Sequence, residues 1–135
     1  MQPIPASRVI FATVPLGTVK GAQIVFPIDK FLADKEIVGI ETYNESQQQT
    51  SPLGAPVVTA ADAAKITITL VRRSAEIHHN IPNNLLNTLS LFGLWKAIPP
   101  TVIDWNSSYI RVTDNLVAAS TFVVPLIVHY IPKDV

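Results

Sequence analysis

Three histidines are the residues of this sequence with the most versatile side-chain chemistry. His78 and His79 are adjacent, whereas His129 lies far along the chain. Because adjacent residues of a strand point to opposite faces, at most one of the pair can join His129 around a single metal ion. We therefore expect no metal site, and we interpret the three histidines as residues of a sheet edge or an interface.

The parts of a nucleophilic triad are also present: Ser107 or Ser108, Asp104 or Asp114, and a histidine. A domain of this size contains such parts by chance, and no strand-turn-helix elbow of the Gly-x-Ser-x-Gly kind surrounds either serine. The sequence predicts a protein that is not an enzyme, with no cofactor and no small-molecule substrate.

Ten basic and ten acidic residues cancel, so no global field draws the chain onto phosphate backbones. Arg72 and Arg73 end a predicted strand and could form a small basic spot with Arg111. Their opposite side-chain directions weaken that interpretation, and no aromatic residues interleave with them as in single-strand binders. Nucleic acid is not an expected partner.

Trp105 and Tyr109 flank a predicted turn at 106–108 and leave two interpretations open. They could form an exposed aromatic platform, which would make the chain a carbohydrate-binding or host-attachment module. Alternatively, Trp105 is a core residue buried beside the turn, which is the commoner arrangement for tryptophan.

The elements that must position these residues are short strands. Eleven prolines are scattered along the chain and divide it into segments of strand length. The absence of cysteine leaves packing alone to hold the fold. The predicted fold is all-β: a single domain over 1–135, a β-sandwich or jelly roll of about eight short antiparallel strands with one or two helical turns.

Individual segments carry this prediction. The clearest strand is 65–72, where Ile66, Ile68 and Leu70 share one face. Thr59 is expected to cap a helical turn with Asp62 at the capping-box position. The other predicted strands are 8–14, 22–26, 37–43 with a bulge at Gly39, 76–80, 101–105, 108–113 and 121–131. In 37–43 we expect Val38, Ile40 and Thr42 to alternate against Ile37, Gly39, Glu41 and Tyr43. The remaining predictions are a loose arm at 1–7, an inward turn carrying Phe31 and Leu32, an exposed loop at 44–56, a short helix within 81–95, and a break at Pro99-Pro100.

The closing strand is apolar on both faces, although a sandwich strand needs only one buried face. Its outer positions Val123, Pro125, Ile127 and Ile131 form a candidate assembly interface. Either a neighbouring subunit or the segment Leu85–Trp95 of the same chain could cover them.

Composition favours the neighbouring subunit, because 48% of the residues are hydrophobic and only 15% are charged, against about 25% in average soluble domains. Pro3, Pro5 and Pro15 interrupt any leader-like run, so we expect no secretion signal. The apolar stretch 122–131 is too short to cross a bilayer as a helix, so no membrane partner is expected.

Three segments together, KITITLVRRSAEIHHNIPNNLLN, TVIDWNSSYIRVTD and STFVVPLIVHYIP, resemble small β-sandwich structural proteins of bacteriophage particles. These are the jelly-roll coat, vertex and decoration proteins. The resemblance covers about two-thirds of the chain and lies in short apolar strands, low charge and polar loops. It implies a virion location, a structural role without catalysis, and partners that are copies of the chain and other virion proteins.

Overall fold

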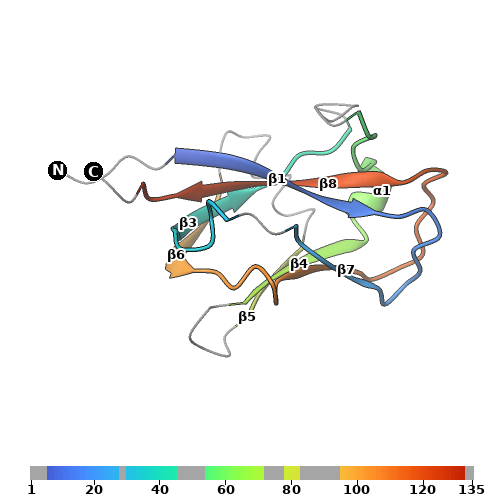
Figure 1. Ribbon diagram of the computed structural model, residues 1–135. Coiled ribbons are helices and arrows are strands. Elements are labelled where there is room, and N and C mark those ends of the chain that lie inside the picture. The colour runs from blue at the N-terminus through green and yellow to red at the C-terminus, as the bar shows by residue number, and fades with distance from the viewer. Residues whose placement is uncertain (1–5, 28–29, 46–53, 72–77, 83–94, 133–135) are drawn as a thin grey trace.

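The computed structural model describes residues 6–27, 30–45, 54–71, 78–82 and 95–132. Two antiparallel sheets of four strands each face one another, which confirms the predicted all-β sandwich (Figure 1). Sheet A has the order β1 (Ala6–Val14), β8 (Phe122–Tyr130), β3 (Glu36–Glu41), β6 (Lys96–Val102). Sheet B has the order β2 (Gln23–Val25), β7 (Tyr109–Val112), β4 (Ile66–Val71), β5 (His78–Pro82), and the short helix α1 spans Ala60–Ala63.

The core lies between the two sheets and follows the alternation of their strands. Ile66, Ile68 and Leu70 of β4 are buried on one face, as predicted. The inner face of β8 supplies Leu126 and Val128, both fully buried. Each such side chain contributes about 1.5–3 kcal/mol by leaving water, so these two strands anchor the sandwich.

Strand β3 contains the bulge that Gly39 predicted. Its register to both neighbours shifts between Ile37 and Gly39, which leaves Val38 without a directly paired residue on β8. Ile37 and Ile40 are therefore both fully buried. The strict alternation that we predicted for this strand is wrong, because the bulge resets which residues face the core.

The prolines 99 and 100 do not end a strand as predicted, because β6 runs through them. Ile37 pairs with Thr101 and Gly39 pairs with Ala97, so three residues of β6 lie opposite Val38 alone. The two prolines thus occupy a bulge on the edge strand of sheet A. Missing N–H donors cost least at bulges and edges, which explains why the strand continues.

Pro125 lies in a central strand, where proline normally removes a ladder hydrogen bond. Its carbonyl accepts a hydrogen bond from the Thr42 hydroxyl, and no strand among the described residues pairs with that side of β8 at this point. The ladder to β3 stops at Glu41 and Ile127, and the next partner is Val57 opposite Val123. The Pro125 nitrogen, which has no hydrogen to donate, faces this unpaired side, so the hydrogen bonds between β8 and β1 are preserved.

Several boundary predictions need correction. Strand β1 begins at Ala6, so the predicted arm is two residues too long. Asn44 is buried although it begins the predicted exposed loop, most of which lies outside the described residues. Leu32 is fully buried as expected, but Phe31 is 43% exposed. The predicted helix within 81–95 also falls largely outside the described residues.

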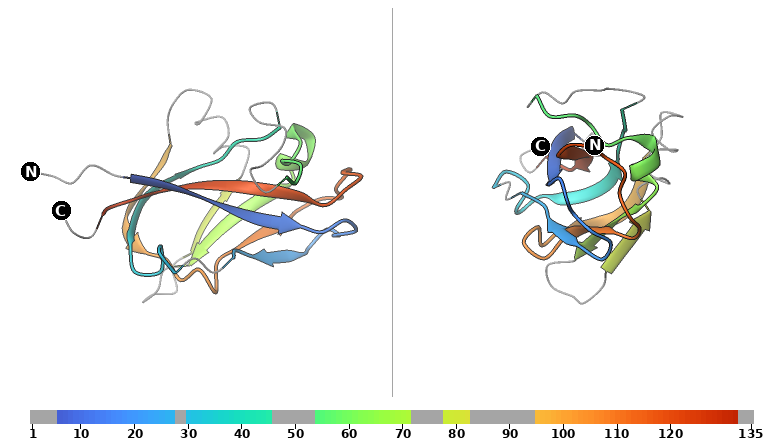
Figure 2. Two further views of the ribbon diagram at one scale, coloured as in Figure 1. Left: turned by 45° about the horizontal axis from the view of Figure 1, so that its top comes forward. Right: turned by 90° about the vertical axis from the view of Figure 1, so that its right-hand side faces the viewer.

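The connections β1–β2 (residues 15–22) and β7–β8 (residues 113–121) meet at one end of the sandwich, opposite the end where β1 begins and β8 finishes (Figures 1 and 2). We call these two connections the loop end. Within the described segments, no helix has the length and hydropathy needed to cross a membrane.

Candidate functional site

The β1–β2 connection consists of two successive hydrogen-bonded turns. In the first, the Thr18 amide donates to the Pro15 carbonyl over 3.2 Å. Gly17 occupies the third turn position with a φ of 90°, a conformation that other residues rarely adopt. The turn places Leu16 at its tip, and the sequence Pro-Leu-Gly explains why it forms here.

The second turn repeats this chemistry and ties the loop to sheet B. The Ala22 amide donates to the Val19 carbonyl over 3.1 Å, and Gly21 has a φ of 93°. The Gly21 amide also donates to the carbonyl of Val112 on β7 over 2.8 Å. These hydrogen bonds hold the loop backbone in place and therefore fix the direction of Val19.

A buried carboxylate holds the backbone of the β7–β8 connection in place. Asp62 of α1 is fully buried, and its two carboxylate oxygens accept from the amides of Val117 and Ala118 over 2.9 and 3.0 Å. Lys65 Nζ lies 3.6 Å from the same carboxylate. Thr59 caps α1 as predicted by accepting from the Asp62 amide, but the longer reach of Asp62 was not foreseen.

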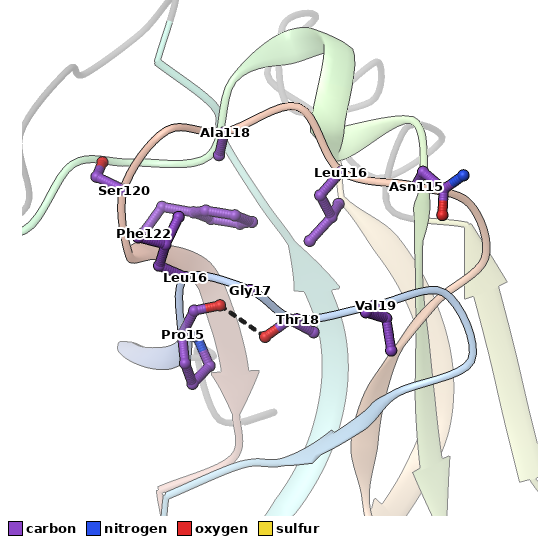
Figure 3. A pocket seen from close by; sticks show the side chains of 10 residues that line it. All are labelled: Pro15, Leu16, Gly17, Thr18, Val19, Asn115, Leu116, Ala118, Ser120 and Phe122. Atoms are coloured by element: carbon purple, nitrogen blue, oxygen red, sulfur yellow. Dashed lines mark hydrogen bonds between the residues drawn. The ribbon is translucent and has the colours of Figure 1, made fainter.

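The two connections are joined and enclose a hollow. The Leu16 amide donates to the hydroxyl of Thr121 over 3.0 Å. Figure 3 shows the ring of Phe122 and the side chain of Leu116 pointing into the space beside the first loop. The hollow has a volume of about 310 Å³ and is lined by Pro15, Leu16, Gly17, Thr18, Val19, Asn115, Leu116, Ala118, Ser120 and Phe122.

Three apolar side chains at the loop end are exposed to solvent, although hydrogen bonds hold the backbone that carries them. Leu16 is 63% exposed, and Val19 and Val117 are each 68% exposed. The only large hydrophobic residues of the described segments that exceed 60% exposure are these three. Sequence reasoning missed them, although the turn glycines Gly17 and Gly21 mark the turns that carry Leu16 and Val19; Val117 has no such signal.

The residues predicted as an assembly interface are divided by the structure. The chain itself buries Val123, which is 1% exposed, and also Pro125. Ile127 and Ile131 are half-buried, and Ile131 lines a separate hollow with Asp34 and other residues at the far end of β8. Only Ile127 and Ile131 remain accessible to a partner.

His129 lies on the outer face of sheet A within a closed side-chain cluster. Its Nε2 is 2.6 Å from Glu41 Oε2, and the indole of Trp95 stacks on its ring at a centroid distance of 3.7 Å. A Cβ on Gly39 would come within 2.6 Å of Trp95 Nε1, so the glycine makes room for the indole. Trp95 thus covers His129 on this face, and residues 85–94, the rest of the segment that could cover the closing strand, lie outside the described residues.

The aromatic platform predicted from Trp105 and Tyr109 does not exist as such. Trp105 is 6% exposed, its ring packs edge-on against Phe26, and its Nε1 donates to the Leu32 carbonyl over 3.4 Å. A buried indole cannot stack on a sugar, so the carbohydrate-binding alternative loses its main residue. Tyr109 is half-buried on β7.

The triad residues are engaged in local turn structure. Asp104 accepts from the Ser107 hydroxyl over 3.0 Å, and Ser108 donates to the Asp104 carbonyl over 2.8 Å. His129 bonds to Glu41 within sheet A, so the structure brings no described histidine side chain to these groups.

Metal ligands and relatives give no further assignment. No group of three or more histidine, cysteine, aspartate or glutamate residues within the described segments is placed to hold a metal ion. The side chains of His78 and His79 lie outside what is described, as do Arg72 and Arg73.

Comparison with protein-family models, curated proteins and solved structures finds no match to the chain.

Proposed function

We propose that this chain is an assembly subunit whose loop end binds another protein subunit. The observation that carries the proposal is the exposure of Leu16, Val19 and Val117 on a backbone that is fixed by turns and by a buried carboxylate. A protein that only needed a closed sandwich could fill these tip positions with polar residues at no cost to its core.

Energetics support binding at this end. Full burial of each Leu or Val side chain contributes about 1.5–3 kcal/mol, most of which the free chain forgoes at the three tips. The turns already hold these side chains in place, so a partner would pay little ordering entropy on docking. Leu16 and Val19 line the same hollow, so one partner segment can contact both.

The finer proposal is that the assembly is a virus particle and that the chain is a coat, vertex or decoration subunit. Its support is the low charge, the absence of cysteine, the sandwich fold and the resemblance of its segments to such proteins. The expected partners are copies of the chain and other virion proteins. The half-buried Ile127 of β8 supplies at most a secondary contact.

The test uses the assembly that contains the chain in its native source. We expect Leu16→Ser with Val19→Ser to fold normally but to be excluded from that assembly. The matched control is Val9→Ser on β1, which is 41% exposed and lies away from the loop end. Equal incorporation of both variants would contradict the loop-end assignment, and electron microscopy of the assembly decides whether it is a virus particle.

A further inference from the structure

A second hollow lies directly beside the loop end, against the central strands β7 and β4 of sheet B. It has a volume of about 270 Å³ and is lined by Lys20, Gly21, Thr67, Arg111, Val112 and Thr113. Two of these residues are cations and none is an acid. The hollow therefore has a distinct positive charge in a protein whose net charge is zero.

The backbone holds the two cations together. Arg111 pairs with Gln23 on one side and Thr67 on the other, in the middle of sheet B. Lys20 precedes Gly21, whose amide is bonded to the carbonyl of Val112, the neighbour of Arg111. Both cations are exposed, and neither makes an ion pair with any residue in the described part of the chain.

The positive hollow is continuous with the apolar tips. Thr18 and Val19 line the loop-end hollow, and the next two residues, Lys20 and Gly21, line the positive one. A segment that covers Val19 is thus within reach of Lys20 and Arg111. One ligand can be expected to contact both.

We infer that the loop end docks a protein segment in which an apolar side chain is flanked by carboxylates. This inference rests on the proposed function and adds the chemistry of the partner. The apolar side chain occupies the loop-end hollow, and an aspartate or glutamate pairs with Arg111 and Lys20. Arginine binds carboxylates in a two-pronged geometry, and two neighbouring cations attract acidic partners from a distance.

A carboxylate suits the positive hollow better than a free phosphate does. The Thr113 hydroxyl already donates to the Lys65 carbonyl over 3.0 Å, which leaves Thr67 as the one neutral side-chain donor of the lining. Phosphate sites usually add several backbone or hydroxyl donors to their cations. Two cations with a single hydroxyl match the needs of a carboxylate.

The experiment titrates isotope-labelled protein with the peptide acetyl-Gly-Asp-Leu-Asp-Gly-amide and with the same peptide carrying Asn in place of Asp. Amide chemical shifts are followed by NMR up to about 10 mM peptide, where a millimolar Kd is visible. We expect the acidic peptide to shift the amides of Lys20, Arg111 and the tips, with a Kd roughly fivefold lower than that of the neutral peptide. Lys20→Gln with Arg111→Gln should remove that difference, whereas Lys96→Gln on β6 should keep it.

The outcomes separate the two levels of proposal. Equal affinity for both peptides, or no shift at Lys20 and Arg111, overturns the acidic-partner inference. Inorganic phosphate that binds as tightly as the acidic peptide also overturns it, because the hollow would then be an ion site. The proposed function is decided separately by incorporation of the Leu16→Ser, Val19→Ser variant into the native assembly.

Discussion

Around Gly39 the outer face of sheet A closes on itself, whereas the loop end leaves apolar side chains in water. On the outer face, Trp95 stacks on His129 and the Glu41 carboxylate satisfies the imidazole. At the loop end the backbone is just as well bonded, yet Leu16 and Val19 remain mostly exposed.

The difference shows that order and burial are separate properties of a surface. A cluster such as that around His129 stabilises the fold, because each of its members covers another. The tips of the loop end contribute little to the fold, while the groups beneath them, Asp62 above all, fix their position. Substitutions in the three places should therefore have effects of different size.

Asp62→Asn should cause the largest loss of stability. An amide has one acceptor oxygen, so one of the two amides at Val117 and Ala118 loses its partner, and the ion pair with Lys65 is lost. We expect the free energy of unfolding to fall by about 3 kcal/mol, measured by urea denaturation.

The matched control for this substitution is Asp114→Asn in the same connection. Asp114 is exposed, and its carboxylate accepts from the adjacent Asn115 amide. A change within about 0.5 kcal/mol is expected there. If the two substitutions lower the free energy of unfolding equally, the Asp62 carboxylate does not hold the backbone of the loop end in place.

Gly39→Ala should be the next most damaging change. The added Cβ would lie within 2.6 Å of Trp95 Nε1, so the indole must leave its place on His129. Overpacking of this kind costs about 2 kcal/mol, and the displaced indole should shift the tryptophan fluorescence to longer wavelength.

A double-mutant cycle isolates the contact between Gly39 and Trp95. In a Trp95→Ala background, Gly39→Ala should cost far less than in the unmodified chain, because nothing remains for the Cβ to meet. An equal cost in both backgrounds would mean that the glycine serves the bulge of β3 and not the indole.

Leu16→Ser and Val117→Ser should leave stability almost unchanged. Both side chains are more than 60% exposed, so their replacement removes little buried area. We expect each to alter the free energy of unfolding by no more than about 0.5 kcal/mol, measured in the same denaturation series. A loss above about 1 kcal/mol for either would show that the tips support the fold.

The fold was largely predictable because strand signals in this chain are local. The alternation of Ile66, Ile68 and Leu70 and the cap at Thr59 depend on residues close in sequence. The errors at β3 and at Pro99 share one cause. Gly39 marked the place of the β3 bulge, but which residues a bulge turns toward the core depends on the strand that lies alongside, and that pairing joins segments distant in sequence.

The site was less predictable for the same reason. The reach of Asp62 to Val117 and the bond from Leu16 to Thr121 join residues that are far apart in sequence. The apolar composition led us to expect a hydrophobic partner surface on the outer face of β8. The structure instead buries Val123, beside which residues 56–58 are hydrogen-bonded, and exposes the turn tips.

The smallest predicted effect concerns Tyr43, which lies just beyond β3 and packs against the hydrophobic core. Burial raises the pKa of the Tyr43 phenol above its ordinary value of 10.0, because the phenolate would lose solvation. The unfolded chain releases this proton at lower pH than the folded chain does. The stability associated with Tyr43 is therefore fully present below pH 10 and is lost as the pH rises through the folded-state pKa. Unfolding free energies at pH 9 and pH 11 should differ less in Tyr43→Phe than in the unmodified chain. An unchanged difference in Tyr43→Phe would place the alkaline loss elsewhere.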